Sequence, residues 1–129
     1  MATSQVAAAK AKALIGVAEA TVLQYADEID HLAGRGEDYT GDEEAQASVD
    51  LAFAGQLAKD AIDLVLRIMG SSAMALSSPL QRYSRDAAVI LSHGAIRLES
   101  VAEVSGRRLL GQPAFDMFTG GLQNKASQK

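Results

Sequence analysis

The chain of 129 residues is 48% hydrophobic and 22% charged, proportions that suit a soluble protein with one globular domain. Its formal net charge of −4 argues against a nucleic-acid partner, and the lack of cysteine excludes disulfides and thiolate chemistry. Because no run approaches the roughly 20 apolar residues of a membrane-spanning helix, we expect a cytoplasmic protein with no membrane partner.

The first predicted element is a long amphipathic helix over residues 4–33. Apolar residues recur along it at spacings of three and four, which place them on one helical face. Glycines at positions 34 and 36 predict its end. His31 stands close to that end, where a cation is favourable beside the helix C-terminus.

The second predicted helix spans residues 41–69. The sequence Thr40-Gly41-Asp42-Glu43 before it is typical of a capping box, and its acidic residues suit the positive end of the helix dipole. Two helices of this length joined by a short acidic loop predict an antiparallel hairpin.

The third predicted helix spans residues 79–110 as one continuous element. A loop of small residues precedes it, and Ser78 followed by Pro79 is a typical helix start. Gly111 and Pro113 predict its end. We assign residues 1–111 to a helical bundle domain and residues 112–129, which lack helical periodicity, to a flexible tail.

Abundant alanine, only 2 prolines and no tryptophan favour an all-α fold with closely packed helices. Three long amphipathic helices form an antiparallel bundle but cover one another only partly, whereas a fourth helix would close the core. The sequence therefore predicts an open apolar groove, which favours association with another chain.

The loop and the third helix carry several short motifs, which together resemble the C-terminal helical domain of the acyl-CoA dehydrogenase superfamily, especially its flavin-dependent monooxygenase branch. The motifs are Gly70-Ser71-Ser72, Pro79-Leu80-Gln81-Arg82-Tyr83, Arg85-Asp86, His93 and Leu109-Leu110-Gly111. The resemblance implies a four-helix bundle of which this chain holds an incomplete set, beginning at the second helix. It also implies N-terminal helical and central β domains, which are missing from this sequence.

The resemblance implies a catalytic role for His93, which in the monooxygenase branch faces the flavin and the substrate. It also implies that Gly70, Ser71 and Ser72 approach a flavin held by a neighbouring subunit, and we group Arg82 with them as a cofactor-binding residue. From spacing alone, His93 would lie on the third helix two turns after Asp86, either in a catalytic role or hydrogen-bonded within the bundle. Likewise, residues 70–72 can be an ordinary glycine cap with a serine loop.

Two further patterns concern the same helix. Arg82 and Asp86 are spaced four residues apart, which predicts an ion pair on one helical face. In many dehydrogenases of the superfamily a carboxylate that removes the substrate α-proton stands where this chain has Gly94. Glycine is not a base, so desaturation by this residue set is disfavoured. No metal-ligand cluster or glycine-rich nucleotide motif is found.

Three hypotheses follow for the function. The first is a small subunit of a heteromeric acyl-CoA-dehydrogenase-like flavin oxidoreductase of the monooxygenase kind, because the motifs favour this branch. It would share FAD or FMN with a larger flavin-binding subunit and be inactive alone. The second is a non-catalytic helical oligomerisation or interaction module, present as a homo-oligomer. The third is a cofactor-free enzyme that uses His93 as a general base.

Overall fold

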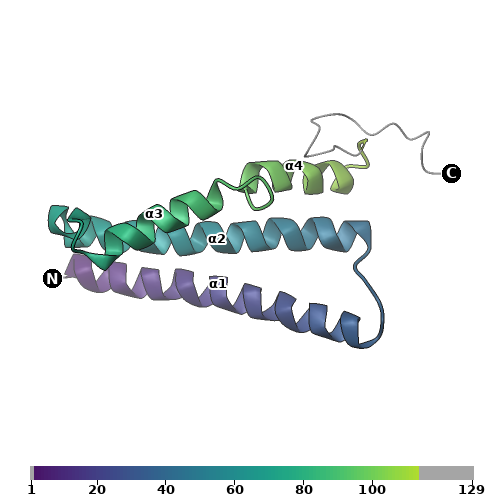
Figure 1. Ribbon diagram of the computed structural model, residues 1–129, viewed down its shortest axis with the longest axis horizontal. Helices are drawn as coiled ribbons and strands as arrows, with labels where there is room; N and C mark the ends of the chain where they lie inside the picture. The colour runs from purple at the N-terminus through teal and green to yellow at the C-terminus, as the bar shows by residue number, and fades with distance from the viewer. Residues whose placement is uncertain (1, 114–129) are drawn as a thin grey trace.

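The structure is a computed structural model that describes residues 2–113 (Figure 1). The all-α prediction is confirmed, since these residues form four α-helices and one short 3-10 helix and contain no strand. The predicted flexible tail lies, from residue 114 on, outside the described residues. The elements are α1 (Ala2–Gly34), α2 (Gly41–Met69), η1 (Ser71–Met74), α3 (Pro79–Leu91) and α4 (Leu98–Leu109).

The predicted hairpin is formed by α1 and α2, and α2 lies between α1 on one side and α3 with α4 on the other (Figure 1). Alanine fills most of the buried positions, because its small side chain lets two helix backbones approach closely. No large side chain in residues 2–113 is fully buried. The buried apolar residues are Ala7, Ala11, Ala18, Ala45, Ala47, Ala52, Ala54, Ala61, Ala73 and Val101.

The start of α2 has the predicted capping box. The Glu43 backbone N–H donates to the Thr40 hydroxyl at 3.3 Å, and the Thr40 backbone N–H donates to the Glu43 carboxylate at 2.8 Å. Both bonds satisfy amides that lack a partner within the helix. The same helix end is tied to the end of α4, because Arg108 Nε donates to Asp42 at 2.8 Å.

The predicted helix over residues 79–110 is wrong as a continuous element, because it is interrupted between Leu91 and Leu98. The Ser92 hydroxyl donates to the Val89 carbonyl at 2.7 Å, and the His93 backbone N–H reaches the Ile90 carbonyl three residues back. These short-range bonds tighten the chain into a turn. Serine, histidine and glycine at positions 92–94 also favour a helix only weakly.

Close packing against α2 fixes the end of α3. A Cβ atom added to Gly55 would lie 2.7 Å from Leu91 Cδ2, so a side chain at position 55 would force the end of the Leu91 side chain to shift. After the turn, α4 continues along the part of α2 that begins at Gly41. The interruption therefore lets two short helices follow the surface of one long helix.

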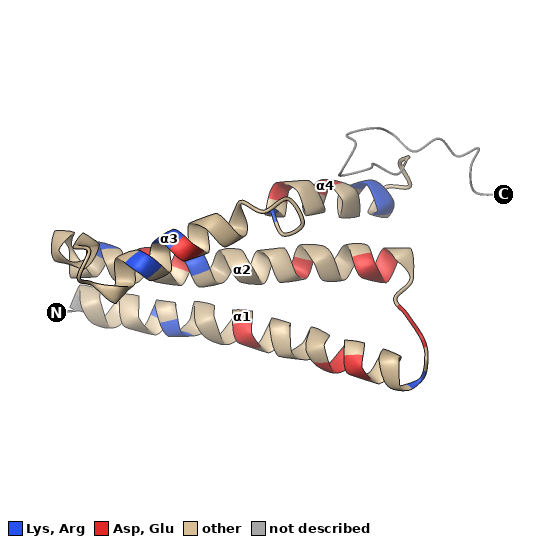
Figure 2. Ribbon diagram, viewed as in Figure 1, with Lys and Arg blue, Asp and Glu red and all other residues tan. Residues whose placement is uncertain are grey.

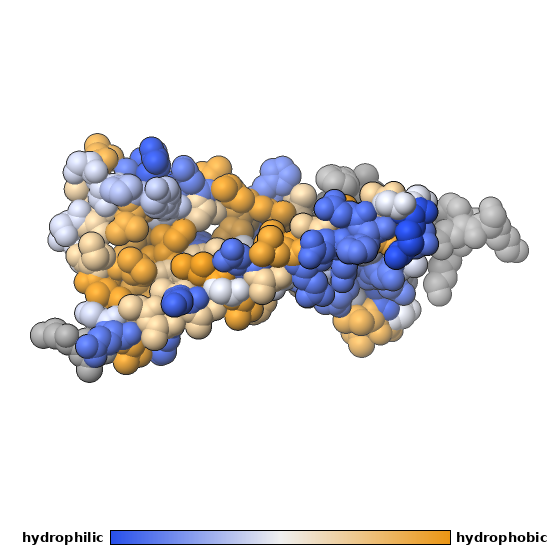
Figure 3. Space-filling model, turned by 90° about the horizontal axis from the view of Figure 1, so that it is seen from below, coloured by the Kyte–Doolittle hydropathy of each residue, from blue (hydrophilic) through white to orange (hydrophobic). Residues whose placement is uncertain are grey.

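Acidic residues are concentrated at one end of the molecule, whereas the other half carries both apolar residues and the charged residues of α3 (Figure 2). Acidic residues cluster where α1 ends and α2 begins, and the half that carries the start of α1 and the end of α2 is predominantly apolar (Figures 2 and 3). Along this flat arrangement many large apolar side chains are exposed, including Val17 at 57% and Phe53 at 52%. The predicted open apolar surface is therefore present.

Candidate functional site

His93 lies in the turn between α3 and α4, so its predicted position on a helix face two turns after Asp86 is wrong. The side chain is exposed, and its Nδ1 accepts the Ala95 backbone N–H at 3.2 Å. Since an amide nitrogen can only donate here, the neutral imidazole carries its proton on Nε2. His93 thus offers a hydrogen-bond donor at Nε2 to whatever approaches the turn.

The cofactor-binding candidates Gly70, Ser71 and Ser72 form the junction from α2 to η1 and are all exposed. Gly70 has φ 74° and ψ −165°, a backbone conformation that is essentially restricted to glycine. No heavy atom of another segment lies within 4 Å of the position that a Cβ would take there. The Ser72 hydroxyl donates to the Met69 carbonyl at 3.3 Å.

Arg82, the fourth cofactor-binding candidate, is exposed near the start of α3 and lies with its guanidinium 5.6 Å from the centre of the Tyr83 ring. The predicted Arg82–Asp86 ion pair is wrong, because no such pair occurs among the residues that the structure describes. A cation over an aromatic ring is a common alternative to an exposed ion pair of small energy.

Gln81 is a residue that the sequence reading missed as an anchor. It is 8% exposed, and its Nε2 donates to the Leu76 carbonyl at 3.5 Å while its Oε1 accepts from Arg85 at 3.3 Å. The side chain therefore ties α3 to the loop before it, and Arg85 acts through it. The signal in the sequence was the position of Gln81 two residues after Pro79, in the first turn of the predicted helix.

The fold does not bring His93 together with the glycine-serine junction. The junction adjoins the start of α3, His93 follows its end, and the 13 residues of α3 span about 20 Å. His93 and the glycine-serine junction therefore lie on two separate parts of the surface.

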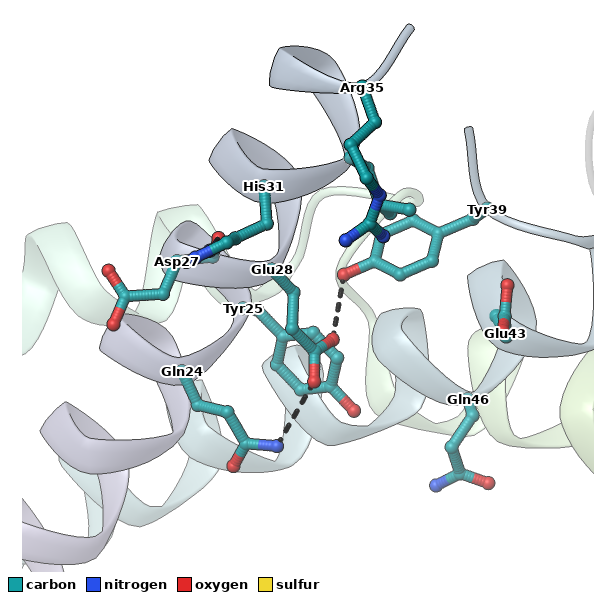
Figure 4. A pocket seen from close by; sticks show the side chains of 10 residues that line it. Gln24, Tyr25, Asp27, Glu28, His31, Arg35, Tyr39, Glu43 and Gln46 are labelled. Carbon is teal, nitrogen blue, oxygen red and sulfur yellow. Dashed lines mark hydrogen bonds between the residues drawn. The ribbon is translucent and has the colours of Figure 1, made fainter. Parts of the chain in front are cut away.

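A polar cleft, also missed by the sequence reading, lies between the last turns of α1 and the first turns of α2 (Figure 4). Tyr25 donates its hydroxyl to Asp50 at 2.5 Å, and Tyr39 donates its hydroxyl to Glu28 at 3.0 Å. Burial, followed by the hydrogen bond to Asp50, raises the pKa of Tyr25 well above its ordinary value, and the pKa of Tyr39 is raised by desolvation and by its bond to Glu28. Both phenols therefore stay protonated at neutral pH.

His31 also lines this cleft. As predicted, it stands in the last turn of α1. Its Nδ1 donates to the Asp27 backbone carbonyl at 2.7 Å, which leaves Nε2 for other partners. The residues that line the cleft lie between positions 24 and 46, on both helices of the hairpin and on the loop between them. Their spacing in the sequence does not predict that they lie close together.

Residues 2–98 match the protein family described as "Acyl-CoA dehydrogenase, C-terminal domain". The chain belongs to this family. This match confirms the resemblance that the sequence motifs predicted. The matched residues include α1, α2, η1 and α3.

Two proteins that are named as hydroxylases are similar to this chain. A "pigment production hydroxylase" of Rhodococcus sp. (strain ATCC 21145) is 31% identical over 72 residues, which are 56% of this chain and 19% of that protein. The crystal structure of 3-HSA hydroxylase from Rhodococcus sp. RHA1 matches 91% of this chain with a TM-score of 0.80 and 26% identity.

A second structure, the HsaA monooxygenase from M. tuberculosis, matches 88% of the chain with a TM-score of 0.78 and 24% identity, which shows the shared fold. The chain spans only 30% of the length of each of these two solved relatives. No helix within residues 2–113 is long and apolar enough to cross a membrane, and the same residues hold no cluster of metal-ligating side chains.

Proposed function

We propose that this chain supplies the C-terminal helical bundle to a heteromeric acyl-CoA-dehydrogenase-like flavin oxidoreductase of the monooxygenase kind. In this proposal a larger subunit holds most of the FAD or FMN and the substrate. The family membership and the hydroxylase names of two relatives support the reaction class. The observation that carries the subunit role is the uncovered apolar surface of the hairpin.

That surface includes a groove of about 480 Å³ between α1 and α2, which we call the hairpin groove. Phe53 and Val17 in it are about half exposed, and such contiguous apolar surface is typical of a protein–protein contact. A helix of the larger subunit packed here would complete the bundle. The groove is lined by Lys10, Ala13, Leu14, Val17, Phe53, Leu57 and Leu64.

The residues at the junction fit a role at the edge of a flavin site. Gly70 leaves open space where a side chain would stand, and Ser71 and Ser72 are exposed hydroxyl groups. A flavin supplies the redox chemistry when bound. The contribution of this chain is a backbone edge that a cofactor can approach closely, with Arg82 as a neighbouring positive charge on the following helix.

His93 contributes a hydrogen-bond donor in the proposed complex. With Nδ1 accepting the Ala95 amide, Nε2–H is free to donate to an oxygen atom of a substrate or intermediate. A cofactor-free enzyme with His93 as general base would first have to break this bond or lose the Nε2 proton. The arrangement therefore favours donation by His93 over proton abstraction.

The test is native mass spectrometry of the chain purified after co-expression with its neighbouring genes. We expect a complex with a larger chain and bound flavin, and turnover only in that complex. A His93→Ala variant should keep the assembly and the flavin but lose turnover by about 10²- to 10⁴-fold, the usual contribution of a proton-transferring side chain. His31→Ala, which removes the other histidine, is the matched control and should leave turnover unchanged.

A non-catalytic interaction module is the second candidate, and it is favoured by the fact that the hairpin groove contains no residue of the proposed chemical surfaces. This candidate predicts a flavin-free homo-oligomer that is indifferent to other subunits. Flavin retained by this chain alone, or a homo-oligomer with no partner, would contradict the subunit proposal.

A further inference from the structure

The polar cleft at the closed end of the hairpin, between α1 and α2, is a cavity that the proposed function leaves unused. Its volume is about 580 Å³, within the range of small-molecule sites. The cleft lies between α1 and α2, whereas His93 follows α3 and α3 packs on α2. Figure 4 shows side chains of both helices and of the connecting loop around it.

The cleft has an excess of negative charge. Three carboxylates line it, from Asp27, Glu28 and Glu43. Arg35 is the one lysine or arginine among the lining residues. Asp50 is not among the lining residues, but its carboxylate accepts a hydrogen bond from the hydroxyl of Tyr25, which is one of them. Carboxylates that are close together attract a cation more strongly than each would alone.

The carboxylates of Glu28 and Asp50 each accept hydrogen bonds from one tyrosine and one glutamine, which are neutral donors. Glu28 accepts from Tyr39 at 3.0 Å and from the Gln24 amide at 3.4 Å. Asp50 accepts from Tyr25 at 2.5 Å and from the Gln46 amide at 2.8 Å. Hydrogen bonds from phenols and amides fix the position of a carboxylate but leave its charge uncompensated.

No cation of residues 2–113 neutralises these two groups. Neither Glu28 nor Asp50 forms a salt bridge within the described chain. Arg35, although it lines the cleft, pairs with Glu37 at 3.2 Å, and its side chain is 58% exposed. Within residues 2–113, no contact therefore brings a positive charge to Glu28 or Asp50.

We propose that this cleft binds an organic cation, an alkylammonium or alkylguanidinium group, against Glu28 and the rings of Tyr25 and Tyr39. Aromatic faces attract cations, and a fixed carboxylate beside them adds charge attraction. Burial and the bonds to Asp50 and Glu28 raise the pKa of Tyr25 and of Tyr39, so both tyrosines are neutral hydrogen-bond donors to these carboxylates. This inference does not depend on the proposed flavin function.

The same chemistry is available from a free small amine and from a lysine or arginine side chain of another protein. The test is isothermal titration of the full chain, at low ionic strength, with n-butylammonium, with butylguanidinium and with a blocked peptide containing one arginine. Neutral butanol and the anion butyrate serve as matched controls. We expect saturable binding of the cations and none of the two controls.

Variants of single charges give the second readout. Glu28→Gln keeps one acceptor oxygen for the Tyr39 hydroxyl but removes the charge, and it should weaken cation binding at least tenfold. Arg35→Gln removes the competing positive charge and should strengthen binding several-fold. Glu19→Gln is the matched control on the same helix, away from the cleft, and should bind as the unchanged chain does.

The comparison of ligands identifies the source of the cation. Tighter binding of the small ions than of the peptide indicates a free amine or guanidine, and the reverse indicates a side chain of a partner protein. Absence of saturable cation binding, equal binding of butanol, or full affinity in a correctly folded Glu28→Gln variant would overturn the proposal. Circular dichroism of each variant provides the folding check.

Discussion

At the scale of single residues, the hairpin is fastened by hydrogen bonds from tyrosine to carboxylate. The bond from Tyr25 in α1 to Asp50 in α2 joins residues 25 positions apart, whereas most other side-chain bonds of the structure span three or four residues. A bond of this kind to a charged acceptor is stronger than a bond between neutral groups. It therefore helps fix how α1 lies on α2.

Removal of this bond gives a prediction with a defined pH dependence. Tyr25→Phe should lower the free energy of unfolding by about 1 kcal/mol at neutral pH. Because the pKa of Tyr25 is higher in the folded chain than its ordinary value of 10.0, the unfolded chain ionises first as the pH rises. The stabilisation is complete below pH 10 and is lost above it, so the difference between the two proteins should narrow at high pH.

Urea unfolding followed by circular dichroism between pH 7 and 11 measures this effect. Tyr83→Phe is the matched control, since Tyr83 is 50% exposed and its ring contact with Arg82 does not need the hydroxyl. Parallel pH curves for the unchanged chain and Tyr25→Phe would show that folding does not raise the pKa of Tyr25.

At the scale of elements, the two glycines in the loops before and after α3 differ in backbone conformation. Gly70 ends α2 with a positive φ, and an L-residue there costs about 1–3 kcal/mol. Gly94, in the turn between α3 and α4, has no positive φ, and no heavy atom of another segment stands where its Cβ would lie. Only the first glycine is required by backbone geometry.

Substitution of each by alanine tests this difference. Gly70→Ala should destabilise the chain by about 1–3 kcal/mol, because the residue must adopt a strained conformation. Gly94→Ala should be neutral or stabilise by up to about 1 kcal/mol, because it reduces the freedom of the unfolded chain. Urea denaturation of both variants decides the matter, and equal effects would contradict the assignment of strain to Gly70.

At the scale of the whole molecule, the buried core is made of alanine while the larger apolar side chains are only partly covered. Alanine buries little apolar area per residue, so such a core stabilises less than one built from leucine and valine. A layer of helices with α2 in the middle also has two open faces (Figure 1). Association with another chain would bury these faces and add stability.

Phe53→Gln tests association through the hairpin groove. We expect it to weaken the assembly seen by native mass spectrometry, since a half-exposed aromatic ring at a contact is a typical source of binding energy, and to leave the helix content unchanged. Val89→Gln is the matched control, because Val89 is 71% exposed on α3 and lies outside the groove. An intact assembly in Phe53→Gln would show that the contact is elsewhere.

Local signals in the sequence predicted a large part of this structure. The capping box at Thr40, the helix start at Pro79 and the end of α2 at Gly70 depend on residues within four positions of one another, and each is found. The lengths of the first two helices and the short loop between them predicted the hairpin, which α1 and α2 form. The motifs from Gly70 to Gly111 indicated the family that the sequence match confirms.

The sequence by itself determined the helical class, the caps and the family, because these depend on neighbouring residues and on short motifs. Only the tertiary structure decided where the third predicted helix breaks, since the apolar spacing from Leu91 to Leu98 continues through the turn while α2 dictates where each part can pack. It also decided that Tyr25 meets Asp50 and Tyr39 meets Glu28, because contacts between helices depend on how far and at what angle the hairpin closes.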